Sequence, residues 1–383
     1  MHPGGRYPGL RVAAFLAAIF IPAGITTAFL PLWLADRGLS AAGIGQVLGI
    51  STFGRLLATP GWGRLADRFG GRRAVLAAAA ALAMLASLAF LPAQGFAVLL
   101  LATVAQGASA SALMPVADAL TLALAREGRL EYGRVRAVGS TAFMGATAAG
   151  GWLVDRLGVR VLPLLLAAGY GAAAALARLL PEPQAAPHAG HGRGGTRLLA
   201  YRPFLLTLAA SALIQGGHAA YYGLASLHWR RHGLSDTMIG LLWAEGVVSE
   251  IALFFWGRRL AERLGPAGLT ALAASAAMLR WTVTGLTTAL PALLAVQVLH
   301  GATYGMQHLS AMLMLSRTVA PERAATAQTL HATLGSSVPT GLLIWATGSL
   351  YDGSGAVFLA MALLGALALP LVSGLHRAWV RHA

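Results

Sequence analysis

Long apolar runs separated by short polar breaks constrain the fold of this chain more than any other feature. A hydrocarbon layer about 30 Å thick needs roughly 20 consecutive apolar residues in a helix. About twelve such runs follow one another, at approximately 11–34, 42–62, 74–92, 96–122, 137–154, 161–180, 204–228, 238–257, 267–286, 291–315, 325–350 and 356–375. We therefore expect an all-α integral membrane protein with about twelve transmembrane helices.

The composition agrees with a chain that mostly faces lipid. Of 383 residues, 57% are hydrophobic and only 11% are charged, whereas about a quarter of an average soluble domain is charged. The first apolar run is too long for the core of a signal peptide, so we interpret it as a retained membrane helix. Cysteine is absent from the sequence, which excludes a disulfide scaffold and a thiolate metal site.

The net charge of +15 would suggest a nucleic-acid partner in a soluble protein, but its distribution indicates membrane orientation. Arginines concentrate in every second connection between the apolar runs, as the positive-inside rule requires. They are Arg64, Arg68, Arg72 and Arg73, then Arg126, Arg129 and Arg134, then Arg193, Arg197 and Arg202, then Arg258, Arg259 and Arg263, and finally Arg317 and Arg323. We expect both termini in the cytoplasm and no nucleic-acid partner.

An internal repeat divides the chain. The segment Trp62–Gly70 recurs as Trp256–Gly265, and Gly38–Ser40 recurs as Gly233–Ser235, at offsets of 194 and 195 residues. Duplication of a six-helix unit predicts an N-terminal half at 1–180, a cytoplasmic linker at 181–203 and a C-terminal half at 204–383. His188 and His191 in the linker lack nearby carboxylates and cysteines, so we expect a solvated loop without a metal.

The repeated segment resembles the loop signature of the major facilitator superfamily, which is read here as Gly63–Arg73 between the second and third helices. The resemblance implies a gating function. Gly63 would permit close helix approach, Asp67 would sit at a helix N-terminus, and Arg68 would pair with acids on the cytoplasmic surface. Gly257 is the repeat counterpart of Gly63. We also expect an inter-helix ion pair between Asp118 and Arg136, which would hold one conformational state.

Further segments resemble the bacterial phenylpropionate permease family over most of the chain. These segments are Pro115–Asp118, Tyr132–Arg136, Gly139–Ser140, Gln215–Gly223, Gly246–Glu250, Arg280–Trp281, His300 and His308. Val138 departs from the tryptophan expected there, and Glu245 is an additional acid. The resemblance implies a multi-pass protein of the bacterial inner membrane that imports aromatic carboxylates with protons.

Ionisable residues inside apolar runs are candidates for function because their charge is costly in lipid. The repeat aligns Arg55 with Glu250, so the two halves carry opposite charges at comparable depth. We expect Glu250 to carry the coupling proton and Arg55 or Arg280 to hold an anionic group; alternatively, Arg280 neutralises Glu250. Glu245 is the weaker candidate, since five residues place it about 140° around the helix from Glu250.

Other polar residues of the apolar runs complete the predicted pathway for substrate or protons. His218, His300 and His308 suit proton relay, although an isolated membrane histidine also serves as a neutral hydrogen-bonding group. His300 and His308 are eight residues apart, and therefore lie on roughly one helix face. Gln215 and Tyr221 offer a polar handle and an aromatic wall for an aromatic substrate.

These observations favour a proton-coupled symporter that imports a small aromatic or other organic carboxylate such as 3-phenylpropionate. Proton symport of nucleosides or sugars and drug efflux by antiport are the alternatives. An enzyme is not expected, because the sequence has no His-Glu-x-x-His helix, nucleophile elbow or phosphate loop. We expect no cofactor and a protein that functions as a monomer in the lipid bilayer, with a small-molecule substrate and protons as its partners.

Overall fold

The computed structural model describes residues 8–69, 71–182, 198–320 and 323–381, without the side chains of Asp67, Phe69, Phe254, Arg258 and Ala325. These described residues form helices and short connections, with no strand among them. They group into two compact units, one made of 1–188 with 234–244 and the other of 189–233 with 245–383. The predicted division at a 181–203 linker stays a prediction, and His188 and His191 lie outside the described residues.

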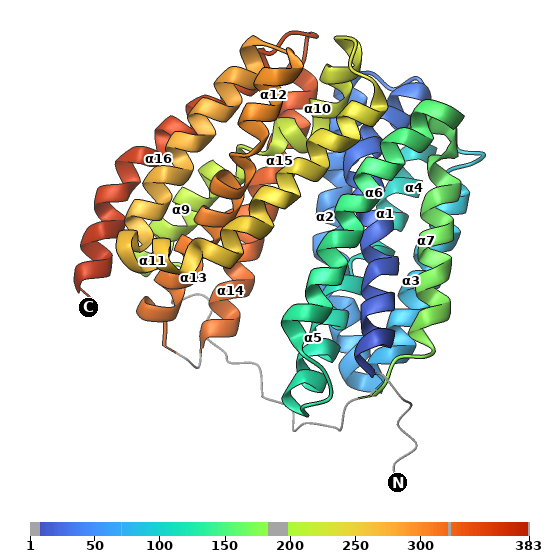
Figure 1. The fold of residues 1–383 in the computed structure, drawn as a ribbon, viewed down its shortest axis with the longest axis horizontal. Coiled ribbons are helices and arrows are strands. Elements are labelled where there is room, and N and C mark those ends of the chain that lie inside the picture. Colours follow the sequence, from blue (N-terminus) through green and yellow to red (C-terminus); the bar gives the residue numbers. More distant parts are fainter. Residues whose placement is uncertain (1–7, 70, 183–197, 321–322, 382–383) are drawn as a thin grey trace. The chain divides into compact units, whose positions relative to one another are not determined.

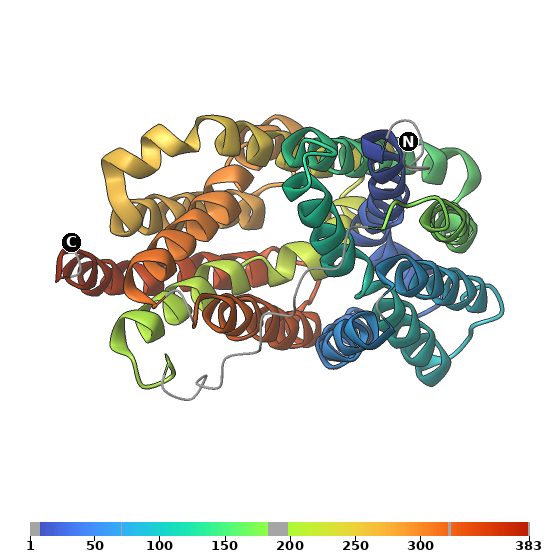
Figure 2. The ribbon, with the colours of Figure 1, turned by 90° about the horizontal axis from the view of Figure 1, so that it is seen from below.

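The first unit is a helical bundle (Figures 1 and 2). Its helices are α1 (Pro8–Asp36), α2 (Ala41–Phe69), α3 (Arg72–Ala89), α4 (Phe96–Ala110), α5 (Leu113–Arg126), α6 (Tyr132–Leu157), the short 3-10 helix η1 (Val159–Val161) and α7 (Leu162–Ala177). Helix α1 packs against α6 and α7, and α3 packs against α4 and α7. Two residues separate α4 from α5, so the predicted run at 96–122 is a helix with one break.

The second unit contains several interrupted helices. Its elements are α9 (Arg202–Gly216), α10 (Ala219–Arg231), most of α11 (Asp236–Leu286), α12 (Leu290–Gln297), the π-helix η2 (Gly301–Met306), α13 (Gln307–Thr318), α14 (Ala324–Ala332), the π-helix η4 (Thr333–Ser337), α15 (Val338–Leu350) and α16 (Ala356–Arg381). Helix α9 packs against α13, α15 and α16. The predicted runs at 204–228, 291–315 and 325–350 therefore each correspond to a broken helix.

Helix α11 bends at Gly265, where φ is +60°, and Pro266 follows. This backbone conformation is strained for residues with a Cβ, so glycine suits the position. Two candidate membrane spans lie in α11, Asp236–Gly257 and Arg259–Leu286, and the bend falls near the start of the second. Within the described residues, eight helical stretches are long and apolar enough to cross a membrane. The predicted all-α membrane fold is confirmed, and the helices are consistent with about twelve spans.

The beginning of α11 is held by a carboxylate from α6, inside the first unit. The backbone N–H groups of Asp236 and Thr237 donate to the two carboxylate oxygens of Asp155 at 2.9 and 2.8 Å, and the Thr237 hydroxyl also donates to it. The first N–H groups of a helix have no partner within the helix and carry its partial positive charge. Asp155 therefore caps α11 from a neighbouring helix, a contact that the sequence analysis did not predict.

Replacing Asp155 by Ala is expected to destabilise the first unit by about 1 to 2 kcal/mol, the usual effect of losing a charged cap. Thermal unfolding in detergent measures the change, and Asp155→Asn should have a smaller effect because its amide oxygen still accepts a hydrogen bond. Asp36→Ala is the control, since Asp36 pairs with Arg160 at the surface, where ion pairs contribute little. Equal midpoints for Asp155→Ala and the parent would contradict the capping role.

Candidate functional site

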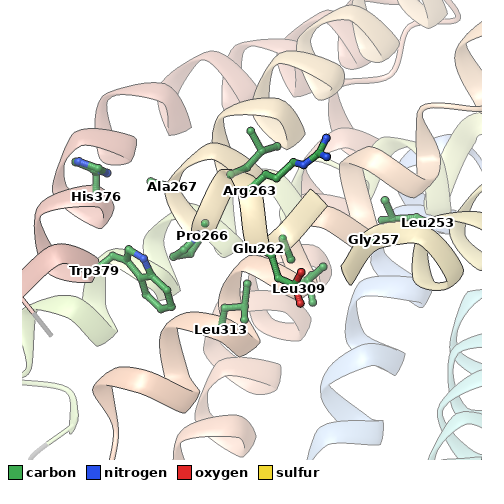
Figure 3. Close-up of a pocket in the computed structure, with 13 residues that line it drawn as sticks. Leu253, Gly257, Glu262, Arg263, Pro266, Ala267, Leu309, Leu313, His376 and Trp379 are labelled. Carbon is green, nitrogen blue, oxygen red and sulfur yellow. The ribbon is translucent and has the colours of Figure 1, made fainter. Parts of the chain in front are cut away.

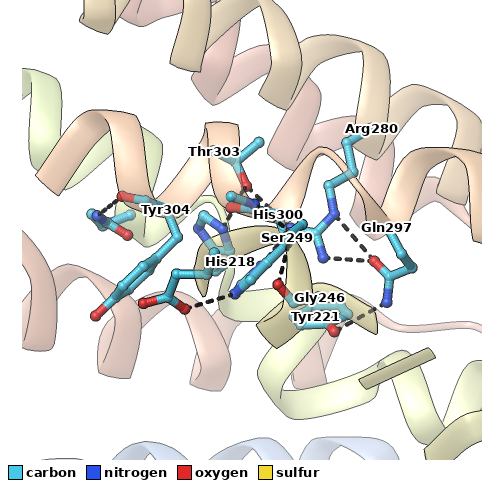
Figure 4. A network of polar contacts seen from close by, with 12 residues as sticks. His218, Tyr221, Gly246, Ser249, Arg280, Gln297, His300, Thr303 and Tyr304 are labelled. Carbon is cyan, nitrogen blue, oxygen red and sulfur yellow. Dashed lines mark hydrogen bonds and ion pairs between the residues drawn. The ribbon is translucent and has the colours of Figure 1, made fainter. Parts of the chain in front are cut away.

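Arg280 of α11 lies at the centre of a polar network inside the second unit (Figure 4). Its side chain is fully buried. Nε and Nη2 donate to Oε1 of Gln297 at 3.3 and 2.7 Å, while Nη1 contacts Nδ1 of His300 at 2.9 Å and the hydroxyl of Thr303 at 3.1 Å. These acceptors are an amide, an imidazole and a hydroxyl, none of which carries a negative charge. Arg280 is therefore held by neutral groups on both edges of its guanidinium.

Aromatic rings cover the faces of the same guanidinium. Its central carbon lies 4.6 Å from the ring centre of Tyr221 and 4.4 Å from that of Trp281. Such cation–π contacts favour a cation that has lost its water. The hydroxyl of Tyr221 also accepts a hydrogen bond of 3.1 Å from Nε2 of Gln297, which fixes the orientation of the amide. Edges and faces together hold Arg280 in one position.

His300 links Arg280 to a carboxylate. Because a guanidinium has no acceptor, Nδ1 of His300 must accept the hydrogen bond from Arg280, and the proton of the neutral ring then lies on Nε2. Nε2 is 3.9 Å from Oε2 of Glu250. The three side chains thus form a row in which the imidazole separates the guanidinium from the carboxylate. Whether Arg280 neutralises Glu250, or holds an anionic group of the substrate, stays a prediction.

The π-helical turn η2 shapes this network. His218 contacts the Ile214 carbonyl through Nδ1 at 3.1 Å and the Thr303 hydroxyl through Nε2 at 3.0 Å. The side chain of Gln215 donates to the backbone carbonyl of Tyr304 at 3.2 Å. A π turn carries one more residue than an α turn and leaves backbone groups available for such contacts. Residues from α9, the α9–α10 break and η2 therefore meet beside Arg280.

Gly301 allows α11 to approach η2 closely. Its N–H donates to the Ser249 hydroxyl at 2.9 Å, and a Cβ at Gly301 would lie 2.5 Å from the backbone oxygen of Ser249 and 2.8 Å from its carbonyl carbon. Backbone atoms at that distance cannot move aside as a flexible side chain does. The absence of a side chain at Gly301 therefore sets the separation between His300 and the part of α11 that carries Glu250.

Gly301→Ala is expected to lower stability by about 1 to 3 kcal/mol, because the added methyl group overpacks the contact with Ser249. Thermal unfolding in detergent tests this. Gly145→Ala is a matched control, since a Cβ at Gly145 would meet no described atom within 4 Å. If both alanine variants unfolded at the same temperature, the proposed close contact would not constrain the fold.

His308 lies at the end of a column of rings that starts at His300. The ring centres of His300 and Tyr304 are 5.8 Å apart and those of Tyr304 and His308 are 6.5 Å apart, with nearly parallel planes. The prediction that His300 and His308 share one helix face is confirmed. Their role in a proton pathway stays a prediction.

Two members of the network were missed by the sequence analysis. Gln297 and Thr303 lie three residues before and after His300, and residues at this spacing share a helix face. Polar side chains repeated at three-residue intervals through an apolar run were therefore the available signal.

Arg55 lies in the first unit, on α2. Its side chain is exposed, and its aliphatic part passes over Gly107 of α4, where a Cβ would lie 3.1 Å from Cγ of Arg55. The hydroxyl of Tyr170, nearby, accepts a hydrogen bond of 2.9 Å from Gln106. Among the described residues, Arg55 forms no ion pair within 4.0 Å. The predicted alignment of Arg55 with Glu250 stays a prediction.

The predicted gating residues have varied surroundings. Asp118 and Arg136 form an ion pair across α5 and α6, 3.7 Å between Oδ1 and Nε. Arg68 is exposed. In the described part of the chain a Cβ at Gly63 would meet no atom within 4 Å, and one at Gly257 would make ordinary contacts, so neither glycine is required for close packing here. Their gating roles stay predictions.

Asp67 lies in the last turn of α2, because that helix continues to Phe69 and α3 begins only at Arg72. The prediction that Asp67 sits at a helix N-terminus is therefore wrong. The repeat segment extends the second apolar run as one helix instead of breaking it near residue 62. The side chain of Asp67 is outside the described part of the structure.

Comparison with known proteins decides the family. Residues 10–362 match the MFS_1 like family. The chain belongs to this family. Two bacterial relatives are each 32% identical to this MFS_1 like protein. A probable 3-phenylpropionic acid transporter of Escherichia coli aligns over 352 residues, 90% of this chain and 92% of the relative. A maltose permease of Geobacillus stearothermophilus aligns over 338 residues, 86% and 84% of the two chains.

A solved structure gives the same fold. The nucleoside transporter NupG superposes with a TM-score of 0.82 at 14% identity, covering 98% of this chain and 99% of that chain. The family match and the two transporter relatives show that the MFS_1 like protein is a multi-pass membrane transporter of the major facilitator type, and not an enzyme. The predicted family and fold class are confirmed.

Proposed function

We propose that this transporter imports a small organic anion, in the first place an aromatic carboxylate such as 3-phenylpropionate, together with a proton. The row Arg280–His300–Glu250 carries the proposal. The E. coli relative at 32% identity, named a probable 3-phenylpropionic acid transporter, supports the substrate class.

Charge balance explains the coupling. While Glu250 is ionised, its negative charge offsets that of the buried Arg280 across His300. Protonation of Glu250 leaves the protein with one more uncompensated positive charge, and binding of an organic anion restores its net charge. Proton and anion therefore favour each other's binding, and by linkage the effect is reciprocal. Loading both ligands leaves the net charge of the site as it was when empty.

We propose Arg55, in the first unit, as the residue that holds the carboxylate of the anion. Both edges of the Arg280 guanidinium are occupied inside the protein, so its role is to set the local charge and to hold the network. Arg55 has an exposed guanidinium in an apolar helix, and a charge at membrane depth faces a cavity or a partner. Its planar fork matches a carboxylate.

Proton-driven uptake into liposomes tests the function. Protein is reconstituted, an acidic exterior is imposed, and labelled 3-phenylpropionate is followed together with the internal pH. We expect accumulation that collapses when the pH gradient is removed. The proposal would be overturned if several aromatic and aliphatic carboxylates were neither taken up into the liposomes nor accompanied by a fall in the internal pH.

Proton symport of a neutral oligosaccharide is the second candidate, because the maltose permease is equally identical to this chain. The neutral hydrogen-bonding groups and aromatic faces around Arg280 would also suit a sugar. Labelled maltose in the same liposomes distinguishes the two candidates. Uptake of maltose that excess 3-phenylpropionate does not inhibit would favour the sugar, and uptake of 3-phenylpropionate alone would favour the anion.

We further propose a monomer in the bacterial inner membrane with both termini in the cytoplasm, which the distribution of arginines supports. Asp67, Arg68, Gly63 and Gly257 would then belong to cytoplasmic gates, with the pair Asp118–Arg136 holding one state. Single cysteines introduced into this cysteine-free chain report the orientation by labelling from either side.

A further inference from the structure

A pocket of about 660 Å³ lies in the second unit, beside the bend of α11 and next to α13 and α16 (Figure 3). Much of its lining is apolar, and includes Leu253, Ala261, Pro266, Leu309 and Leu313. The volume is in the range of pockets that hold small ligands. The pocket is separate from the Arg280 network and shares no residue with it.

The position of the pocket is at the boundary between membrane and water. Residues 261–267, which include the bend at Gly265 and Pro266, line it from the first turns of the candidate membrane span Arg259–Leu286. His376 and Trp379 line it from the last turns of α16, close to the end of another candidate span. Tryptophan is enriched at this depth, where its ring meets lipid headgroups.

The mouth of the pocket carries two basic side chains and one acidic side chain. Arg263 and His376 are exposed lining residues, and the guanidinium of Arg317 lies 4.2 Å from the ring centre of Trp379. Glu262 is the acid among the lining residues. Apolar walls below a mouth that carries an arginine and a histidine match an amphiphile with an anionic headgroup.

We propose that this pocket binds an anionic phospholipid of the surrounding bilayer. The apolar walls take part of an acyl chain, and Arg263 with His376 contacts the phosphate. A phospholipid is the occupant because the pocket lies where headgroup meets hydrocarbon, and because basic groups there attract anionic lipids. The bent part of α11 would thereby be held at the lipid surface.

Brominated lipids test the site, because bromine on an acyl chain quenches tryptophan fluorescence on contact. The full chain is placed in nanodiscs of phosphatidylcholine, and brominated phosphatidylglycerol or brominated phosphatidylcholine is titrated in. Since the chain has 9 tryptophans, the signal of Trp379 is taken as the difference between the parent and Trp379→Phe. We expect this component to be quenched at a much lower fraction of the anionic lipid than of the zwitterionic one.

Three variants separate a site from general attraction. Arg263→Gln should raise the half-saturating fraction of anionic lipid about fivefold, the effect of one arginine near an anionic surface. Ala261→Phe fills the pocket and should abolish the preferential quenching. Arg377→Gln removes an equal charge beside the pocket and should change little.

Equal quenching of the Trp379 component by both brominated lipids would overturn the proposal. So would equal effects of Arg263→Gln and Arg377→Gln, or preferential quenching that survives Ala261→Phe, since these results indicate attraction to the surface without an occupied pocket. None of these readouts depends on transport, so the outcome is independent of the proposed substrate and coupling.

Discussion

Arg55→Lys is expected to weaken binding of the organic anion about 10- to 100-fold, while the protein remains folded. A charge-assisted hydrogen bond contributes about 1.5 to 3 kcal/mol, and lysine cannot reproduce the paired donors of a guanidinium. The dissociation constant of 3-phenylpropionate, measured at fixed pH by calorimetry on purified protein, gives the result. Arg64→Lys on the same helix is the control, because Arg64 lies in the basic segment beyond the apolar run.

Arg280→Lys provides the contrast. It removes the hydrogen bonds of a fully buried side chain to Gln297, His300 and Thr303, so its main effect should be a lower unfolding temperature. An Arg55→Lys variant that binds the anion as tightly as the parent would exclude Arg55 as the anion ligand. If, in addition, Arg280→Lys kept full stability and lost binding, the roles assigned to the two arginines would have to be exchanged.

Glu250→Gln is expected to abolish uphill accumulation and to preserve exchange of internal for external substrate. The amide keeps the size of the carboxyl group but cannot release a proton, so the site stays in the form that accepts an anion. With one proton carried per anion, the parent should accumulate substrate about tenfold for each unit of pH gradient. The variant should reach no accumulation, and liposomes loaded with labelled substrate report the exchange.

The pH dependence of binding follows the same charge balance. In the parent, the anion should bind more tightly as pH falls, because protonation of Glu250 removes a negative charge from the protein. In Glu250→Gln that dependence should vanish. Glu245→Gln is the matched control, since Glu245 is a carboxylate on the same helix five residues earlier. Proton-driven accumulation by Glu250→Gln would remove Glu250 from the coupling mechanism.

The helices were predictable because the length of an apolar run reports directly on the thickness of the bilayer. The boundary between the runs at 238–257 and 267–286 is the bend at Gly265 and Pro266, two residues that interrupt a helix through their own backbone chemistry. The π turns η2 and η4 were not predictable in this way. Contacts with other helices accompany them, such as the hydrogen bond from Gln215 to the Tyr304 carbonyl.

The candidate site was predictable only in part. Arg280, His300 and Glu250 stood out because ionisable residues are rare in apolar runs. Their order in space could not be predicted, because the sequence cannot show that an imidazole lies between the two charges. The neutral partners Gln297 and Thr303 were missed because an uncharged polar residue in an apolar run attracts little notice until the buried charge that it serves is located.

The π turn η2 contains one residue more than an α-helical turn. If that residue passed out of the turn, the segment beyond it would advance by one position, and α13 would rotate by about 100° relative to α12. Thr303 would leave Arg280 while His300, before the turn, kept its place. Such a shift would rearrange one end of the site while the other end stayed fixed.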